Sequence, residues 1–436
     1  MVGVLGLPGF TLAFSGGGLA ALGWGMVLAG AGLAWIDALN ARSRLDGVRV
    51  ALPGTVRVVR GRPFDLEVEV EVPENGVRRL RLGLMLGREF AGTDREIDAP
   101  LDPAMRSETV RWPMVARFRG RWEYGTLYLE ARSRWGLWAR RRSDAVALEI
   151  RAYPDMRGER RGLSALFLNR GTVGGHARRQ VGKGREFEQL REYAPGDDYA
   201  DIFWKGTARR GFPMTKMFQI ERTQEVYVVV DHSRLSAREI PTADHAGITT
   251  QLERFLQAAL ALGLVAERQG DLFGVASFAE RVDRFIRARN GKAHYDVCRD
   301  ALYNLQPRMV SPDFEELVVF LRTRLTRRAL IVVLTDLGDA LTAESFAEDI
   351  RLVARQHVVL AVALKPAVAR PVFAGGPAAS VGEIYDRLGG QLQWDALSEV
   401  GKVLGKSGVQ FVMPEHDDLT GDIVARYLNV KQRQLI

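Results

Sequence analysis

The sequence predicts a multidomain fold: an N-terminal transmembrane helical hairpin, an antiparallel β-sandwich domain and a mostly parallel α/β domain. Residues 1–36 of the 436 contain no charged side chain. Apolar and polar residues then alternate in short runs, which is typical of half-buried strands. Fully apolar runs separated by helical periods follow in the last half of the chain, and they favour a sheet covered on both faces. We therefore predict four segments, at residues 1–44, 45–150, 151–220 and 221–436.

The composition excludes two broad classes of protein. Hydrophobic residues make up 47% of the chain and charged residues 26%, so there is enough apolar material for a packed core and disorder is excluded. Cys298 is the single cysteine. A fold held by internal disulfides is therefore excluded, and a reducing compartment fits best. By its pattern, Cys298 is expected to lie within a helix as a small buried residue.

The uncharged N-terminus is longer than the ~20 apolar residues that cross a bilayer. Gly16–Gly18 interrupt it, which predicts a helix over Val2–Phe14, a turn, and a second helix over Leu19–Leu39. Thirteen residues make only ~20 Å of helix, so the first helix is too short to span and one or two passes remain open. Arg42 and Arg44 follow the second helix and place its carboxyl end in the cytoplasm.

In residues 45–150, apolar side chains recur at every second position of several short runs. Apolar and acidic residues alternate strictly in Phe64–Val72, which predicts a strand with one buried face. Turn-forming residues separate this run from similar ones, and several short strands at such spacing predict an antiparallel sandwich. The other predicted strands are Thr55–Val59, Val77–Met85, Thr109–Arg117 and Thr126–Ala131.

The stretch Arg117–Arg142 combines arginines with Trp122, Trp135 and Trp138. Basic residues interleaved with aromatic ones can bind single-stranded nucleic acid. The alternative is a pair of strands with a packed aromatic face and solvated arginines. The strand-like spacing favours this second interpretation.

The junction at residues 151–220 contains 14 basic and 8 acidic residues, so it carries +6 of the net charge of +8. Asp197 and Asp198 lie in a turn signal, where both could reach one cation. Alternatively, Asp198 caps a short helix over Tyr199–Arg209. An anion or an acidic partner could bind the four residues Trp204, Lys205, Arg209 and Arg210, unless the tryptophan docks on the next domain and the bases are solvated.

This junction resembles the signature of the domain of unknown function 58 family of bacterial proteins. The matching residues are Glu186, Phe187, Leu190, Arg191, Tyr193, Gly196, Asp197, Asp198, Ile202, Trp204, Lys205, Ala208, Arg209, Arg210 and Gly211. Phe203 departs from the signature, which usually has a polar residue there. The resemblance extends to the whole layout, and it implies that residues 221–436 form a von Willebrand factor A-like domain of the Rossmann type.

In residues 221–436 strands and helices alternate. Two fully apolar strands, Glu225–Val230 and Ala329–Leu334, lead to Asp231 and Asp336, and ligands of such sheets bind beyond the carboxyl ends of the strands. Ser311 is expected to cap a helix over Asp313–Leu325. The remaining predicted elements are a helix at Ala243–Gln269, strands at Asp271–Ala279 and Val282–Ala288, a helix at Ala343–Arg355, a strand at His357–Leu364, a helix at Val381–Leu404, a strand at Val409–Met413 and a last helix.

The residues after the first of these strands resemble the Asp-x-Ser-x-Ser metal-ion-dependent adhesion site of von Willebrand A domains. Asp231 and Ser233 match, whereas Leu235 occupies the second serine position and Ser236 follows one residue late. The resemblance assigns Asp336 to the third loop and Ser311 to the threonine position, and it implies Mg²⁺, which oxygen ligands suit. The alternative is a metal-free remnant in which Asp231 and Ser233 cap the following turn.

The leading functional hypothesis is a non-enzymatic protein-binding scaffold, anchored by its N-terminal helices in the lipid of the cytoplasmic membrane with its soluble domains in the cytoplasm. No phosphate-binding loop, zinc spacing or nucleophile elbow occurs in the sequence. The resemblance implies a MoxR-type AAA+ ATPase as the partner and a role in the assembly or maturation of other proteins. The partner-binding residues would be Asp197, Asp198, Trp204, Lys205, Arg209 and Arg210.

Two alternatives remain. A metal-dependent hydrolase would use Asp197, Asp198, Asp231 and Asp336, with His232 as the candidate base. A membrane-tethered nucleic-acid-binding protein would use the basic junction, and its affinity would fall steeply with salt.

Overall fold

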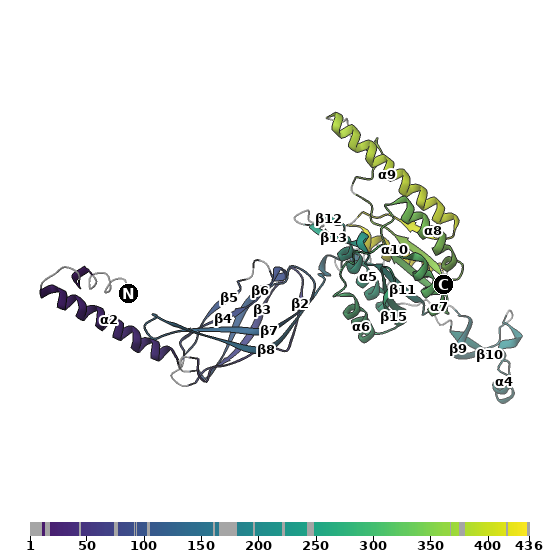
Figure 1. Ribbon diagram of the computed structural model, residues 1–436. Coiled ribbons are helices and arrows are strands. Elements are labelled where there is room, and N and C mark those ends of the chain that lie inside the picture. Colours follow the sequence, from purple (N-terminus) through teal and green to yellow (C-terminus); the bar gives the residue numbers. More distant parts are fainter. Residues whose placement is uncertain are drawn as a thin grey trace. The chain divides into compact units, whose positions relative to one another are not determined.

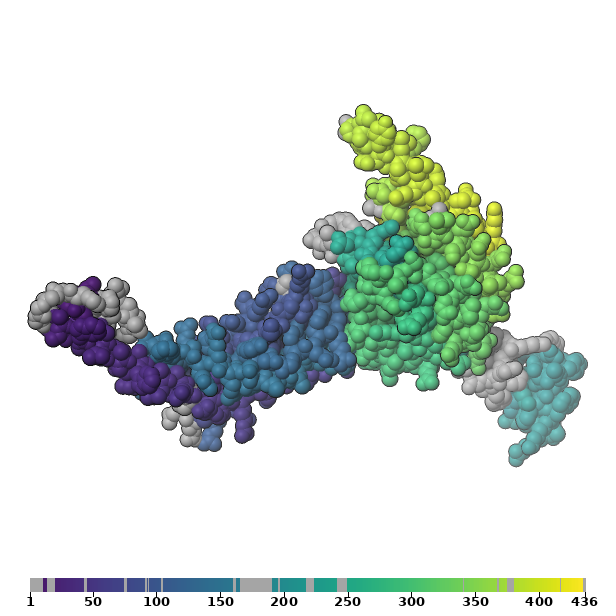
Figure 2. All heavy atoms as spheres, in the orientation of Figure 1, coloured from purple at the N-terminus to yellow at the C-terminus, as the bar shows by residue number. Residues whose placement is uncertain are grey.

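The computed structural model divides the chain into two compact units, Met1–Asp155 and Met156–Ile436 (Figures 1 and 2). It describes the whole chain except residues 1–10, 14–17, 43–44, 74–76, 91, 93, 103–104, 160–161, 165–180, 195–196, 220–222, 242–247, 367, 375–379, 416 and 434–436.

The first unit contains the long helix α2, Gly18–Arg42 (Figure 1). Within the described residues, one helix is long and apolar enough to cross a membrane, at Ala20–Arg42, and little of it is buried. It contains the predicted second helix and continues for one more turn. Most of the predicted first helix, Val2–Phe14, lies outside the described residues, so the hairpin stays a prediction.

Two sheets follow, and both contribute side chains to one hydrophobic cluster. The strict alternation predicted for Phe64–Val72 is present, because Leu66, Val68 and Val70 are buried while the acidic residues between them face solvent. One sheet has the order β1-β3-β6 and the other β2-β8-β7-β4-β5. The strands are β1 Arg49–Ala51, β2 Thr55–Val59, β3 Pro63–Glu71, β4 Arg79–Leu84, β5 Glu96–Pro100, β6 Ser107–Val115, β7 Gly120–Arg132 and β8 Ala139–Tyr153.

The sequence predicts antiparallel pairing throughout this segment, and one pair of strands departs from that prediction. β2 pairs with β8 in parallel. The chain leaves β2 through a turn at residues 60–62 and enters β3, which belongs to the other sheet. β2 therefore has no hairpin partner, and it lies instead beside the last strand of the unit.

The second unit is built on a six-stranded sheet with the order β15-β14-β11-β16-β17-β18. When only the strands of this sheet are numbered along the chain, that is the order 3-2-1-4-5-6 of doubly wound α/β proteins. All pairs are parallel except β14 with β15, which confirms the predicted mostly parallel sheet. The strands are β11 Glu225–Asp231, β14 Leu272–Phe278, β15 Val282–Arg289, β16 Ala329–Leu334, β17 Val358–Val362 and β18 Gln410–Val412.

Helices cover both faces of this sheet (Figure 1). One hydrophobic cluster joins it to α5 Gln251–Arg268, α6 Lys292–Leu302 and α10 Leu419–Gln432. A second joins the other face to α7 Phe314–Arg324, α8 Ala340–Ala354 and α9 Val381–Lys406. Cys298 is buried in α6, as predicted, and burial raises the pKa of its thiol to about 12.

Two predicted helix starts are wrong. Asp313, and not Ser311, caps α7, since its carboxylate accepts a hydrogen bond from the backbone N–H of Glu316 at 2.9 Å. The helix α5 begins at Gln251 and not near Ala243, because residues 248–250 form strand β13, which pairs with β12 (Glu239–Pro241). In both places a side chain that caps the helix decides where it starts.

Candidate functional site

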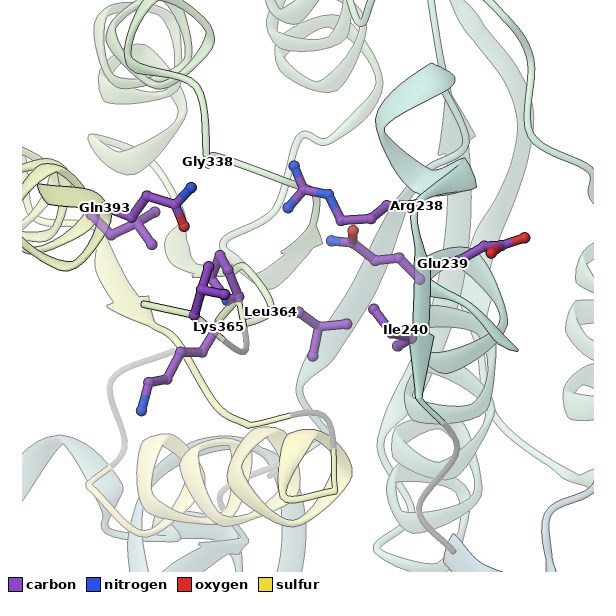
Figure 3. Close-up of a pocket in the computed structure, with 11 residues that line it drawn as sticks. Arg238, Glu239, Ile240, Gly338, Leu364, Lys365 and Gln393 are labelled. Carbon is purple, nitrogen blue, oxygen red and sulfur yellow. The ribbon is translucent and has the colours of Figure 1, made fainter. Parts of the chain in front are cut away.

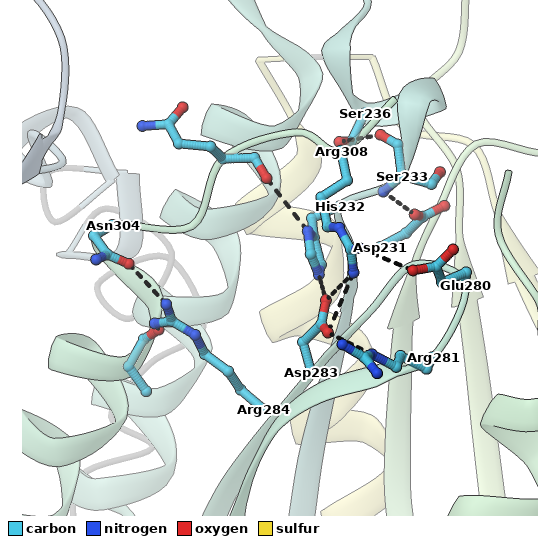
Figure 4. Close-up of polar contacts among 12 residues, drawn as sticks. Asp231, His232, Ser233, Ser236, Glu280, Arg281, Asp283, Arg284, Asn304 and Arg308 are labelled. Carbon is cyan, nitrogen blue, oxygen red and sulfur yellow. Dashed lines mark hydrogen bonds and ion pairs between the residues drawn. The ribbon is translucent and has the colours of Figure 1, made fainter. Parts of the chain in front are cut away.

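At the carboxyl edge of the six-stranded sheet, the two predicted aspartates belong to a polar network, of which Figure 4 shows Asp231 with Ser233. Asp231 ends β11 and is only 1% exposed. Its Oδ1 accepts a hydrogen bond from the backbone N–H of Ser233 at 2.8 Å, and its Oδ2 accepts one from the hydroxyl of Thr335 at 2.7 Å. A buried carboxylate needs such donors, so Asp231 ties the loop after β11 to the end of β16.

Asp336 lies one residue beyond Thr335 and is also buried. Its Oδ1 accepts a hydrogen bond from the backbone N–H of Gly338 at 2.9 Å, and its Oδ2 is 3.0 Å from Nη1 of Arg238. Burial raises the pKa of both aspartates above the ordinary value, although the charge of Arg238 opposes that shift at Asp336. A guanidinium therefore supplies positive charge at this edge.

The residues of the predicted Mg²⁺ site are engaged in contacts within the protein. Both oxygens of Asp231 already accept hydrogen bonds, and Asp336 is paired with a cation. The hydroxyl of Ser236 donates to the backbone carbonyl of Ser233 at 2.8 Å. Ser311 Oγ accepts a hydrogen bond from Nε of Arg234 at 3.3 Å. In the described part of the chain, no group of three or more His, Cys, Asp or Glu side chains could hold an ion.

A cavity of about 280 Å³ opens beside this network (Figure 3). Arg238 and Gly338, which contact Asp336, form part of its wall. Lys365 adds a second cation, which pairs with Glu415 at 3.3 Å, Glu239 adds a carboxylate, and Leu364 and Leu397 add apolar surface. With two cations against one carboxylate and an apolar wall, the cavity suits one acidic or amphipathic side chain of a partner.

His232 belongs to a separate cluster of charged residues (Figure 4). Its Nε2 lies 2.9 Å from Asp283, and its Nδ1 lies 3.3 Å from the backbone carbonyl oxygen of Gln306. Arg308 bonds to Asp283 at 3.1 Å and to Glu280 at 2.8 Å. Burial acts to raise the pKa of Asp283, but the hydrogen bond and charge of Arg308, together with His232, outweigh it and lower that pKa. These contacts join the loop after β11 to β15 and to the segment between α6 and α7.

The family signature forms a β-hairpin of β9 (Val181–Glu192) and β10 (Met214–Gln219). Asp197 closes its turn: the carboxylate pairs with Arg191, accepts the backbone N–H of Ala194 at 3.0 Å and accepts the hydroxyl of Thr215 at 3.3 Å. Asp198 caps the following turn through the N–H of Ala200, as predicted. Both carboxylates therefore have structural partners in the hairpin, and the four-aspartate site of the hydrolase alternative is not assembled among the described residues.

The predicted helix over Tyr199–Arg209 is in fact two short ones, the 3-10 helix η2 (Tyr199–Asp201) and α4 (Trp204–Arg210). Ile202 separates them because it forms a bridge with Thr215. Trp204 is 66% exposed, and Lys205, Arg209 and Arg210 are exposed with it. The predicted basic surface of α4 is therefore open to solvent.

Phe203, the position that departs from the signature, has a packing role. Its ring lies over Gly206, where a Cβ would come within 2.4 Å of it. The ammonium of Lys216 lies 5.0 Å from the centre of the same ring. An aromatic residue at position 203 thus packs α4 against β10. Much of the basic junction lies outside the described residues, so the nucleic-acid alternative stays a prediction.

Thr335, Arg238 and Asp283 were missed by reasoning from the sequence. Thr335 had a signal, since it directly precedes an aspartate that follows a buried strand. No sequence signal pointed to Arg238 or Asp283, because their partners are distant in the chain.

Residues 189–370 match the family model described as "Protein of unknown function DUF58", which confirms the resemblance over that stretch. Similar curated proteins include uncharacterized proteins of Mycobacterium tuberculosis and Mycobacterium bovis. Each is 26% identical over 183 residues, which cover 42% of this chain and 55% of the relative. The match therefore spans about half the length of these relatives.

Among similar solved structures is the conserved hypothetical protein BatB of Bacteroides thetaiotaomicron, with 14% identity and a TM-score of 0.30 over 48% of this chain and 99% of that chain. An aerotolerance-related membrane protein of Bacteroides fragilis has 15% identity and a TM-score of 0.31 over 47% and 98%. The VWA domain of SpRpn10 has 10% identity and a TM-score of 0.28 over 46% and 95%. At such TM-scores, none of them bears on the function of this chain.

The raised pKa of Asp231 predicts how stability depends on pH. The folded protein holds the proton of Asp231 to higher pH than the unfolded chain does, so the contribution of Asp231 to stability falls as the pH rises from about 4 through its folded pKa. Asparagine has no charge to bury. We therefore expect Asp231→Asn to gain more stability relative to wild type at pH 7 than at pH 4, measured by urea unfolding in detergent.

Asp296→Asn is the matched control for this measurement, since Asp296 forms a partly exposed ion pair with Arg299 on α6. A difference between Asp231→Asn and wild type that is the same at both pH values would contradict the account.

The pairing of Arg238 with Asp336 predicts weak binding of Mg²⁺ by the wild-type chain. Removing the guanidinium leaves the carboxylate without its cation, so Arg238→Gln should bind Mg²⁺ at least about tenfold more tightly. Titration calorimetry measures both affinities, and Arg281→Gln, which removes an exposed arginine that contacts Asp283 instead, is the control. Equal or tighter binding by the wild type would show that Arg238 does not stand in for a metal.

Proposed function

We propose that this chain, which carries a DUF58 region, is a membrane-anchored, non-enzymatic scaffold that binds another protein at the carboxyl edge of its α/β domain. The observation that supports this most is the cavity beside the Arg238–Asp336 pair. It offers positive charge and apolar surface at the edge where ligands of doubly wound sheets bind. In such a site, Arg238 and Lys365 would receive an acidic side chain of the partner.

The α/β domain is of the von Willebrand A type in this proposal, and its edge is a degenerate form of the metal-ion-dependent adhesion site. Asp231 and Ser233 keep the loop after β11 in shape, while Arg238 supplies the charge that Mg²⁺ would otherwise bring. Coordination of Mg²⁺ by Asp231, Ser233, Asp336 and Ser311 stays a prediction from the sequence, which the contacts in this structure do not favour.

The anchor would be α2, with the soluble units on the cytoplasmic side as Arg42 indicates. The resemblance to the family suggests a MoxR-type AAA+ ATPase as the partner and the assembly or maturation of other proteins as the process. The exposed face of α4, with Trp204, Lys205, Arg209 and Arg210, would provide a second contact, since exposed tryptophan and arginine are typical of interface hot spots.

A binding measurement with the purified ATPase of the same organism tests this proposal. Arg238→Glu reverses the charge of the cavity wall and should weaken binding by the full-length chain in detergent at least about tenfold, which corresponds to 1.4 kcal/mol. Asp231→Asn should weaken it as well, because the loops of the edge lose their shared carboxylate.

Asp296→Asn, on α6, is the control and should bind as the wild type does. Unchanged binding by both edge variants would rule out the carboxyl edge as the docking site. A loss confined to Trp204→Ala would move the docking site to α4.

A further inference from the structure

The carboxyl-terminal end of α2 is tied to the loop between β7 and β8, residues 133–138. Asp37 is fully buried on α2 although it carries a carboxylate. Its oxygens accept hydrogen bonds from the hydroxyl of Ser133 at 2.5 Å and from the backbone N–H groups of Trp135 at 3.1 Å and Leu137 at 3.2 Å. Three donors on one carboxylate offset the cost of burying it.

Two further contacts fix the same loop and strand to the helix end. The indole N–H of Trp138 donates to the backbone carbonyl of Ala34 at 2.9 Å. Arg142, on β8, donates to the carbonyls of Leu45 and Val48, both at 2.7 Å, in the segment that follows α2. The loop is therefore held beside the point where the apolar helix ends.

The surface of this loop has the composition of a lipid–water interface. Trp135 is 47% exposed and Trp138 is 51% exposed, and Trp35 is exposed on the adjoining turn of α2. Four arginines surround the two tryptophans, and the sequence has no acidic residue between positions 131 and 143. All four are exposed, and one of them, Arg141, also pairs with Glu130 at 2.6 Å: Arg132, Arg134, Arg140 and Arg141. Tryptophan concentrates at membrane interfaces, and clustered arginines are attracted to anionic headgroups.

We propose that the β7–β8 loop is a second membrane contact, which binds the anionic phospholipid headgroups next to the carboxyl end of α2. Trp135 and Trp138 lie at headgroup depth, and the arginines contact the phosphates. The inference rests on the proposed anchoring by α2, and it adds that the first β unit is held against the bilayer rather than free on a tether. Charge complementarity and continuity with the apolar helix both favour lipid as the occupant.

The test places a fluorescent probe on the loop of the full-length protein in vesicles that contain anionic phosphatidylglycerol. Trp135→Cys is labelled with an environment-sensitive aromatic fluorophore. The hydrogen bond from position 135 to Asp37 survives this substitution, because its donor is the backbone N–H. Phe118→Cys is the matched control, since Phe118 is 56% exposed and precedes the other end of β7. The buried Cys298 is left in place, and unsubstituted protein gives the background.

The expected result is blue-shifted emission at position 135 and several-fold less quenching by aqueous iodide than at position 118. Replacing phosphatidylglycerol by phosphatidylcholine should reduce the difference. Asp37→Ala in the labelled protein should raise quenching at 135, because the loop loses its acceptor.

Flotation of the same samples separates the two proposals. If the protein does not float with the vesicles, both the proposed anchoring by α2 and the proposed loop contact are wrong. Protein that floats while position 135 is quenched as strongly as position 118 overturns the loop contact alone. A probe that is protected only after a protein or nucleic acid is added would assign the surface to that ligand instead of lipid.

Discussion

Burial of the Asp231 carboxylate at the end of the central strand is the constraint on which the carboxyl edge depends. Its neighbours in the sheet are β14 and β16, so the charge has no route to water and must find donors within the protein. Ser233 and Thr335 provide them from two different loops. The position of Thr335 then determines where Asp336 begins the next loop, and Asp336 in turn determines where Arg238 lies.

This chain of contacts orients the loops of the carboxyl edge through groups of the protein itself. In a metal site, the cation balances the carboxylates and orients the loops. Here hydrogen bonds orient the loop after β11, and a guanidinium balances Asp336. Arginine is always charged and has several donors, so it can hold this carboxylate and still present N–H groups to a partner. In the proposed function, this arginine would favour acidic groups of a partner.

The sequence was sufficient wherever one periodicity dominated. β2 and β16 have the predicted bounds, and the alternating run of β3 was found because a single face of each strand is buried. It was insufficient where a tertiary contact decides the local structure. Ile202 breaks the helix of the signature by pairing with Thr215, and Thr250 and Asp313 decide where α5 and α7 start. The sequence predicted three residues of the candidate site, Asp231, Ser233 and Asp336. It did not predict Arg238, because the partner of Arg238 lies about a hundred residues away in the chain.

The central claim is that the carboxyl edge recognises its partner through Arg238 and not through a metal. The most direct test is the affinity of the full-length chain for the AAA+ ATPase, measured without nucleotide in EDTA and again in millimolar Mg²⁺. The account predicts the same dissociation constant in both buffers. Binding that disappears in EDTA and returns with Mg²⁺ would contradict it.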